Sequence, residues 1–228
     1  RTLKVQLLDR QGGAANIQTA AALASDLAKE VPANAKVLMI AGQALWLQGN
    51  LTEAAARFTQ AAKADPGSTG PRLALARLEV RRKNYAAALQ HSDAALAIRP
   101  DDLNARLLRV VALNGTGAYD AARSEAQQLA LDTKSAPQVE LQLGVVALGQ
   151  KHYAEAETHF RKVYSETGGD VQPLAGLVNT FIAEHSPDRA LDLLQNEIQR
   201  TPDSAGKQAL LVATAQAAGK TDLALSEL

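Results

Sequence analysis

The sequence predicts an all-α fold, an α-solenoid built from antiparallel pairs of helices. Three observations lead to this prediction: the same residue types recur every 34 positions, small and aliphatic side chains dominate the apolar content, and turn-forming residues separate helix-sized segments. A fixed period of about 20–50 residues is typical of repeat architectures, in which each unit is too small to be stable alone and buries its apolar face against its neighbours.

The most regular column of the repeat is occupied by alanine. Steps of 34 from residue 20 reach alanine every time without an insertion, at Ala20, Ala54, Ala88, Ala122, Ala156, Ala190 and Ala224. Alanine combines the highest helix propensity with a side chain of a single methyl group. The column therefore predicts the places where two helices approach each other most closely.

Three further columns share the period, two of them with exceptions. Proline occupies one of them at Pro32, Pro66, Pro100 and Pro202, with Lys134 and Gly168 as the exceptions. An apolar column contains Leu7, Ala41, Leu75, Leu143, Leu177 and Leu211, and Arg109 interrupts it. The column directly after it contains Leu8, Gly42, Ala76, Val110, Gly144, Val178 and Val212.

One segment illustrates how each predicted repeat is built. Apolar residues at helical spacing predict a first helix within residues 35–48, which Gly49 and Asn50 end. We expect Thr52 to cap the second helix at its N-terminus. Pro66 closes the unit, because proline cannot continue a helix.

The two ends of the chain depart from this pattern. Two consecutive glycines follow Gln11, so we expect the first helix to stop near Arg10. Leu225 and Leu228 would lie in a last helix without a partner. The chain begins at Arg1 without a methionine or a signal-peptide pattern, and we interpret it as a piece of a longer protein.

Composition narrows the possible functions. Apolar residues make up 46% of the chain, enough for a core, whereas aromatic residues make up 4%. Lys+Arg and Asp+Glu both number 24, so no basic excess predicts a nucleic-acid partner. No apolar run has the length of a membrane span, and the absence of cysteine excludes disulfides and thiolate metal sites. The compartment stays open between bacterial cytoplasm and periplasm.

The sequence contains no motif for catalysis or for a cofactor. Neither a phosphate-binding loop nor a nucleophile elbow is present, and we expect a protein that is not an enzyme. His152, Glu155 and His159 lie close enough in sequence for a metal site to be considered. No third strong ligand is evident, and we expect His159 to be a solvated surface residue and no metal to bind.

The columns resemble the tetratricopeptide repeat (TPR), whose pattern is W-x2-L-G-x2-Y, then A-x3-F, then P. Segment 35–68 carries it best, with Gly42, Leu45, Ala54, Phe58 and Pro66. The resemblance covers the whole chain and implies a right-handed superhelix. It implies one solenoid over 1–228, with six full repeats and a truncated seventh: 1–34, 35–68, 69–102, 103–136, 137–170, 171–204 and 205–228.

In this family the first helix of each repeat lines a concave groove that binds peptides or helices. The resemblance therefore implies a partner-binding set at Met39, Gln43, Trp46, Leu73, Arg77, Arg81, Leu107, Val111, Asn114, Leu141, Val145 and Asn179, with Leu47 beside them. The family's clamp for C-terminal carboxylates needs Lys and Asn in columns that hold Met39 and Gln43, so we do not expect that clamp. Trp46 either anchors a partner or packs within the solenoid.

The resemblance favours a protein–protein interaction scaffold that belongs to a larger bacterial TPR protein. Two alternatives stay open. In the first, the chain is a regulatory or targeting domain of an enzyme such as a glycosyltransferase. In the second, it is a part of a secretion or exopolysaccharide-export assembly. End-to-end self-association through open solenoid ends is a further possibility.

Arg109 and Glu79 each place a charge in a column that is otherwise apolar. Adjacent first helices would bring these columns together, so we expect a structural ion pair between them, with Arg106 nearby. The alternative is that they contact a polar ligand.

Overall fold

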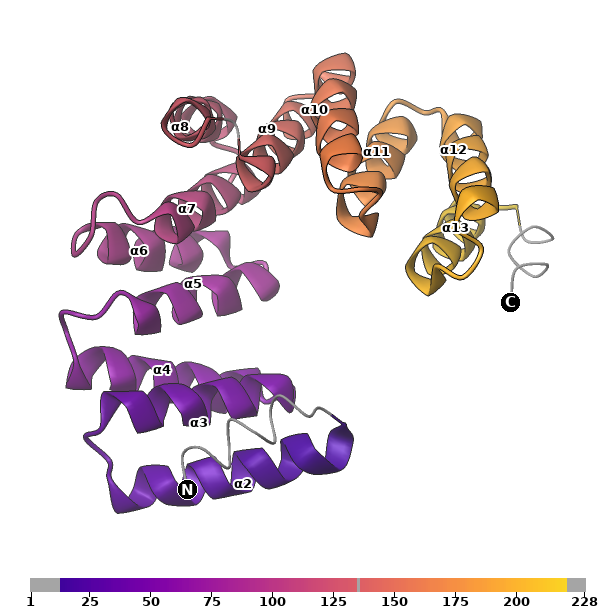
Figure 1. The fold of residues 1–228 in the computed structure, drawn as a ribbon. Helices are drawn as coiled ribbons and strands as arrows, with labels where there is room; N and C mark the ends of the chain where they lie inside the picture. The colour runs from indigo at the N-terminus through magenta and orange to yellow at the C-terminus, as the bar shows by residue number, and fades with distance from the viewer. Residues whose placement is uncertain (1–12, 135, 221–228) are drawn as a thin grey trace. The chain divides into compact units, whose positions relative to one another are not determined.

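The computed structural model describes residues 13–134 and 136–220, and this part of the chain contains twelve α-helices and no strand (Figure 1). The prediction of an all-α helical repeat is confirmed. The helices are α2 (Ala14–Glu30), α3 (Ala35–Leu47), α4 (Leu51–Ala64), α5 (Gly70–Arg81), α6 (Tyr85–Leu96), α7 (Leu103–Gly115), α8 (Tyr119–Asp132), α9 (Pro137–Gly149), α10 (Tyr153–Glu166), α11 (Val171–Ala183), α12 (Pro187–Arg200) and α13 (Ala205–Ala217). The predictions for Arg10, Ala224, Leu225 and Leu228 lie outside the described residues.

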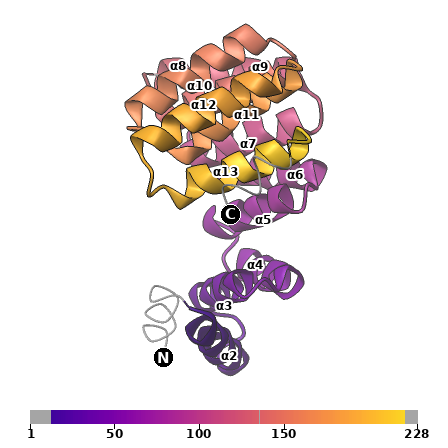
Figure 2. The same cartoon turned by 90° about the vertical axis from the view of Figure 1, so that its right-hand side faces the viewer.

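The chain divides into two compact units. Unit 1 comprises Arg1–Thr116 and unit 2 comprises Gly117–Leu228, so the boundary falls inside the fourth predicted repeat, between α7 and α8. Within unit 1, α2, α3 and α4 lie side by side (Figure 1, Figure 2). One continuous solenoid of six full repeats and a truncated seventh stays a prediction.

The alanine column lies at the centre of the packing in both units. Each of its described members is 0% exposed: Ala20, Ala54, Ala88, Ala122, Ala156 and Ala190. All six lie on second helices. A methyl group is the largest side chain that these positions accept without movement of a neighbouring helix.

Glycine and phenylalanine form a second close contact. A Cβ atom on Gly42 would lie 2.4 Å from the ring of Phe58, and one on Gly144 would lie 2.8 Å from the ring of Phe160. A Cβ atom on Gly176, in α11, would also lie 2.6 Å from the Phe160 ring. The ring of Phe160 therefore packs directly on backbone of both α9 and α11, and this contact joins two consecutive predicted repeats of unit 2.

The turn between the first and second helix repeats one backbone conformation every 34 residues. The residue after each first helix's C-cap has a positive φ: Gly49 (85°), Lys83 (59°), Gly117 (81°), Lys151 (62°), His185 (59°) and Gly219 (72°). At Lys83, the N–H group donates to the carbonyl of Val80 at 2.9 Å, and the N–H of Asn84 donates to the carbonyl of Glu79 at 2.9 Å. This is the Schellman arrangement, in which glycine is the favoured left-handed residue.

Two local predictions were wrong. The N-cap of α4 is Asn50, whose side chain accepts a hydrogen bond from the N–H of Glu53 at 3.3 Å, whereas Thr52 lies inside the first turn. Asparagine takes this role because it directly follows the left-handed residue, where the chain is still outside the helix.

The ion pair expected between Arg109 and Glu79 is also not formed. The carboxylate of Glu79 accepts from Arg82 at 3.0 Å and from Asn84 Nδ2 at 2.9 Å, while Arg109 Nε donates to Asp93 at 2.8 Å. Partners three and five residues away reach Glu79 from its own turn. A comparison of equivalent positions in successive repeats does not reveal partners that lie within the same turn.

Lys83 occupies a left-handed position that costs a non-glycine residue about 1–2 kcal/mol. We therefore expect Lys83→Gly to raise the free energy of unfolding. The gain should be only about 0.5–1 kcal/mol, because glycine loses more conformational entropy on folding than lysine and this loss offsets part of the relieved strain. Urea denaturation measures this change. The reciprocal variant Gly49→Lys, at the equivalent position, should be destabilised; a stability unchanged in both variants would contradict the role given to this column.

Alanine normally stabilises a helix relative to glycine, but at residue 144 we expect the opposite sign. The new methyl group meets the Phe160 ring, and such overpacking costs roughly 1–3 kcal/mol. Thermal or urea unfolding of Gly144→Ala measures this loss. The matched control is Gly70→Ala, whose Cβ atom would meet only Ser68 Oγ at 3.6 Å, an ordinary contact. Equal changes in stability in the two variants would show that the Phe160 ring does not restrict the size of the side chain at residue 144.

Candidate functional site

A hollow of about 350 Å³ opens on unit 1 between α3 and α5. Its lining residues come from three helices: Gln43, Trp46 and Leu47 from α3, Phe58 from α4, and Ala74 and Arg77 from α5. Three residues of the sequence-predicted set, Gln43, Trp46 and Arg77, thus lie at one place.

Trp46 has two roles in this hollow. Its ring meets the ring of Phe58 edge to face, with the centroids 6.3 Å apart, and it packs against the unit 1 core. It is nevertheless only half-buried, and it lines the hollow. Leu47, its neighbour, is 51% exposed. The wall of the hollow is therefore apolar, held in place by Phe58 and open to solvent.

The other predicted residues of unit 1 lie on the first helices α3, α5 and α7. Arg77 and Arg81 are exposed on α5, and Arg77 Nη2 is 3.5 Å from Asn104 Oδ1. Asn114 has a buried Oδ1 atom that accepts no hydrogen bond among the described residues. The remaining members are half-buried: Met39 on α3, Leu73 on α5, and Leu107 and Val111 on α7.

The three predicted residues of unit 2 differ from one another. Leu141 is 9% exposed and belongs to the core cluster that contains Phe160 and Leu177. Val145 packs against the same cluster, whereas Asn179 on α11 is exposed. Most of the Leu141 side chain therefore contributes to the core rather than to the surface.

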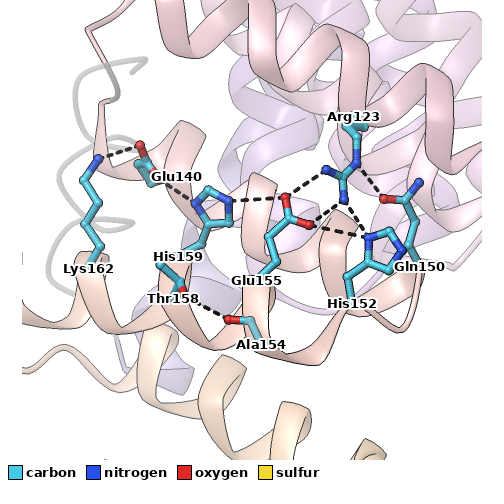
Figure 3. Close-up of polar contacts among 9 residues, drawn as sticks. All are labelled: Arg123, Glu140, Gln150, His152, Ala154, Glu155, Thr158, His159 and Lys162. Carbon is cyan, nitrogen blue, oxygen red and sulfur yellow. Dashed lines mark hydrogen bonds and ion pairs between the residues drawn. The ribbon is translucent and has the colours of Figure 1, made fainter.

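A second cluster of polar side chains joins α8, α9 and α10 in unit 2 (Figure 3). The guanidinium of Arg123 donates through Nη1 and Nη2 to the two carboxylate oxygens of Glu155, both at 2.8 Å. Its Nε donates to Gln150 Oε1 at 2.7 Å, and Nη2 lies 3.0 Å from His152 Nδ1. A bidentate pair of this kind fixes both distance and orientation between α8 and α10.

The cluster continues to a buried carboxylate. Glu140, 4% exposed on α9, accepts from Lys162 Nζ at 2.6 Å and lies 2.8 Å from His159 Nδ1 (Figure 3). His159 is thus a half-buried partner of Glu140, and the expectation of a solvated surface histidine was wrong. Among the described residues, no group of three or more His, Asp or Glu side chains has an arrangement that could hold a metal ion.

The charges of this cluster are held by mutual hydrogen bonds. The bond from Arg123 lowers the pKa of the Glu155 carboxyl below its ordinary value of 4.5, although partial burial opposes the shift. The bond to Glu140 raises the pKa of the Lys162 ammonium. The Arg123–Glu155 pair therefore remains ionised around neutral pH, and Lys162 remains protonated.

A third cluster ties α13 to α10 and α12. Lys207 is 4% exposed, and its Nζ donates to Tyr164 Oη at 3.0 Å and to Glu197 at 3.2 Å. The Tyr164 hydroxyl donates to the same carboxylate. Burial alone would lower the pKa of Lys207, but these hydrogen bonds outweigh it and raise the pKa. A protonated ammonium is not a nucleophile, so the cluster fits a structural role.

Sequence reasoning missed several of these residues. Ala74 and Phe58 complete the hollow, but both belong to ordinary apolar columns. The Tyr164–Glu197–Lys207 cluster joins residues up to 43 positions apart, which no single repeat contains. A usable signal existed at Glu197 and Lys207, because each places a charge in a repeat column that is otherwise apolar.

Comparisons with known proteins agree with the helical repeat. Two family models, both described as tetratricopeptide repeat, match residues 45–90 and 73–140. A search of the curated proteins found no match. In the part of the chain that the structure describes, no helix has the length and hydropathy of a membrane span.

Solved structures share the fold at low sequence identity. A tetratricopeptide repeat protein from Parabacteroides merdae has a TM-score of 0.77 at 18% identity, over 93% of this chain and 84% of that one. PilW, a type IV pilus biogenesis factor, has a TM-score of 0.72 at 19% identity, over 92% and 97%. YrrB, described as a TPR protein with an unusual peptide-binding site, has a TM-score of 0.53 at 16% identity, over 82% and 96%.

The lowered pKa of Glu155 predicts a pH-dependent contribution to stability. Its stabilising effect is complete above pH 4.5 and is lost as the pH falls through the lower pKa of the folded state. At pH 7 we expect Glu155→Gln to cost about 0.5–1 kcal/mol, because the carboxylate is partly screened by solvent. In urea unfolding between pH 7 and pH 3, the difference in the free energy of unfolding between the variant and wild type should shrink as the pH is lowered. Glu166→Gln, on the exposed side of α10, is the control and should show no such decrease.

Proposed function

Since the chain belongs to the tetratricopeptide-repeat family, we propose that it is a protein–protein interaction scaffold that binds a peptide or helix of its partner along its first helices. The repeat fold supports the general role of a scaffold. The peptide or helix, and the first-helix face as its place, are the specific parts of the proposal.

The hollow beside Trp46 is the observation that carries the proposal. It combines large apolar side chains that remain partly exposed with exposed polar ones, and Gln43, Trp46, Leu47 and Arg77 all come from first helices. Aromatic and arginine side chains in a concave site are enriched among residues that dominate binding energy. YrrB, which has a similar fold and is described as having a peptide-binding site, supports a peptide as the bound form.

A catalytic role has less support in the described residues. The polar clusters of unit 2 pair their cations with their carboxylates, and Lys207 is kept protonated. Such pairs stabilise helix contacts, whereas a catalytic group needs a substrate within reach of an available acid, base or nucleophile. The family is also one of binding proteins in general.

Site-specific photo-crosslinking tests the proposal. We expect a photoreactive phenylalanine analogue at position 43 to crosslink a partner in an extract of the source organism, because Gln43 is exposed on α3 and lines the hollow. The control position is Gln90, which is exposed on the second helix α6. Crosslinks at position 90 but not at position 43 would place the partner on another face and overturn the first-helix assignment.

A further inference from the structure

Basic side chains are concentrated on one first helix of a chain whose net charge is zero. Residues 70–84 contain five basic side chains and one acidic one: Arg72, Arg77, Arg81, Arg82 and Lys83 against Glu79. The whole chain has 24 of each sign, so this excess is a local property of α5 and the turn that follows it. An excess of this kind attracts an acidic partner and steers its approach.

Only part of this charge is used within the protein. Arg72 Nη1 donates to the carbonyl of Ser68 at 2.9 Å, and Arg82 pairs with Glu79 at 3.0 Å. Arg77 and Arg81 are exposed and have no carboxylate partner among the residues that the structure describes, and Arg77 makes a long hydrogen bond of 3.5 Å to the neutral Asn104 Oδ1. Two cations of α5 are therefore available to a partner.

One of these two cations lines the apolar hollow, and the other lies on the same helix face. Arg77 lines the hollow directly, and Arg81 lies four residues further along α5, which is about 6 Å along the helix axis and on the same face. Trp46 and Leu47 provide the apolar wall. The site therefore offers one pocket for a large apolar side chain and, next to it, two arginines whose positions on α5 are about 6 Å apart along the helix axis.

We infer that this site binds an acidic amphipathic segment of a partner protein. Its large apolar side chain fills the hollow beside Trp46, and two carboxylates about 6 Å apart, as on residues i and i+4 of a helix, pair with Arg77 and Arg81. The inference rests on the proposed function and specifies the chemistry of the partner. A nucleic acid fits less well, because the wall of the hollow is apolar and the chain as a whole carries no basic excess.

Selection from a displayed library of random peptides on the full chain tests the inference. We expect the selected peptides to be enriched in Asp and Glu next to a large apolar residue, and their binding to weaken as salt is raised. The double variant Arg77→Glu, Arg81→Glu should bind them about tenfold more weakly or worse. The matched control is Arg57→Glu, Lys63→Glu, which makes the same charge change on the second helix α4 and should leave binding unchanged. Circular dichroism checks that both variants are folded.

The outcomes separate the inference from the proposed function. Selected peptides without acidic residues, or peptides that bind the Arg77→Glu, Arg81→Glu variant as well as wild type, would overturn the inference and leave peptide binding intact. Displacement of a selected peptide by a random single-stranded DNA at equal concentration would assign the site to nucleic acid instead. If wild type selects no peptide at all, both the inference and the proposed function fail.

Discussion

The close approach of helix backbones at small side chains is the constraint on which the rest of the structure depends. Six alanines at one repeat position are 0% exposed, and glycines meet the rings of Phe58 and Phe160 where no Cβ atom fits. Close-packed interiors transmit a volume change of even one methylene to their neighbours. The small size of the side chains at these positions therefore sets the distance between the helices. This distance determines which other side chains can contact one another.

Two different kinds of surface follow from this spacing. In unit 2, long polar side chains link consecutive second helices: Arg123 reaches Glu155, and Arg189 reaches Glu157 at 3.1 Å. In unit 1, the face beside Trp46 carries an apolar hollow, and two arginines of α5 have no carboxylate partner among the described residues. Partly exposed charge pairs give orientation at little net gain in stability, whereas unpaired charge beside apolar surface is suited to recognition.

The repeat and its helices could be predicted from the sequence because every copy of a column faces the same packing problem. The alanine column, the buried leucines and the turn at Gly49 all follow from this repetition. Features of a single turn were not predictable in this way, since Asn50 rather than Thr52 caps α4 and Glu79 takes Arg82 as its partner. The hollow was predictable only in part: the family resemblance implied Gln43, Trp46 and Arg77 as binding residues, but their convergence on Phe58 depends on the packing of three helices.

Trp46 is the only tryptophan of the chain, and it lines the hollow, so its fluorescence reports on this place alone. The most direct measurement of the central claim is a titration of the full chain with a bound peptide, followed by Trp46 emission and by calorimetry in parallel. The account predicts that the emission shifts to shorter wavelength and saturates with the same dissociation constant as the heat, because the partner's apolar side chain removes water from the indole. Saturable heat without any change in Trp46 emission would contradict it.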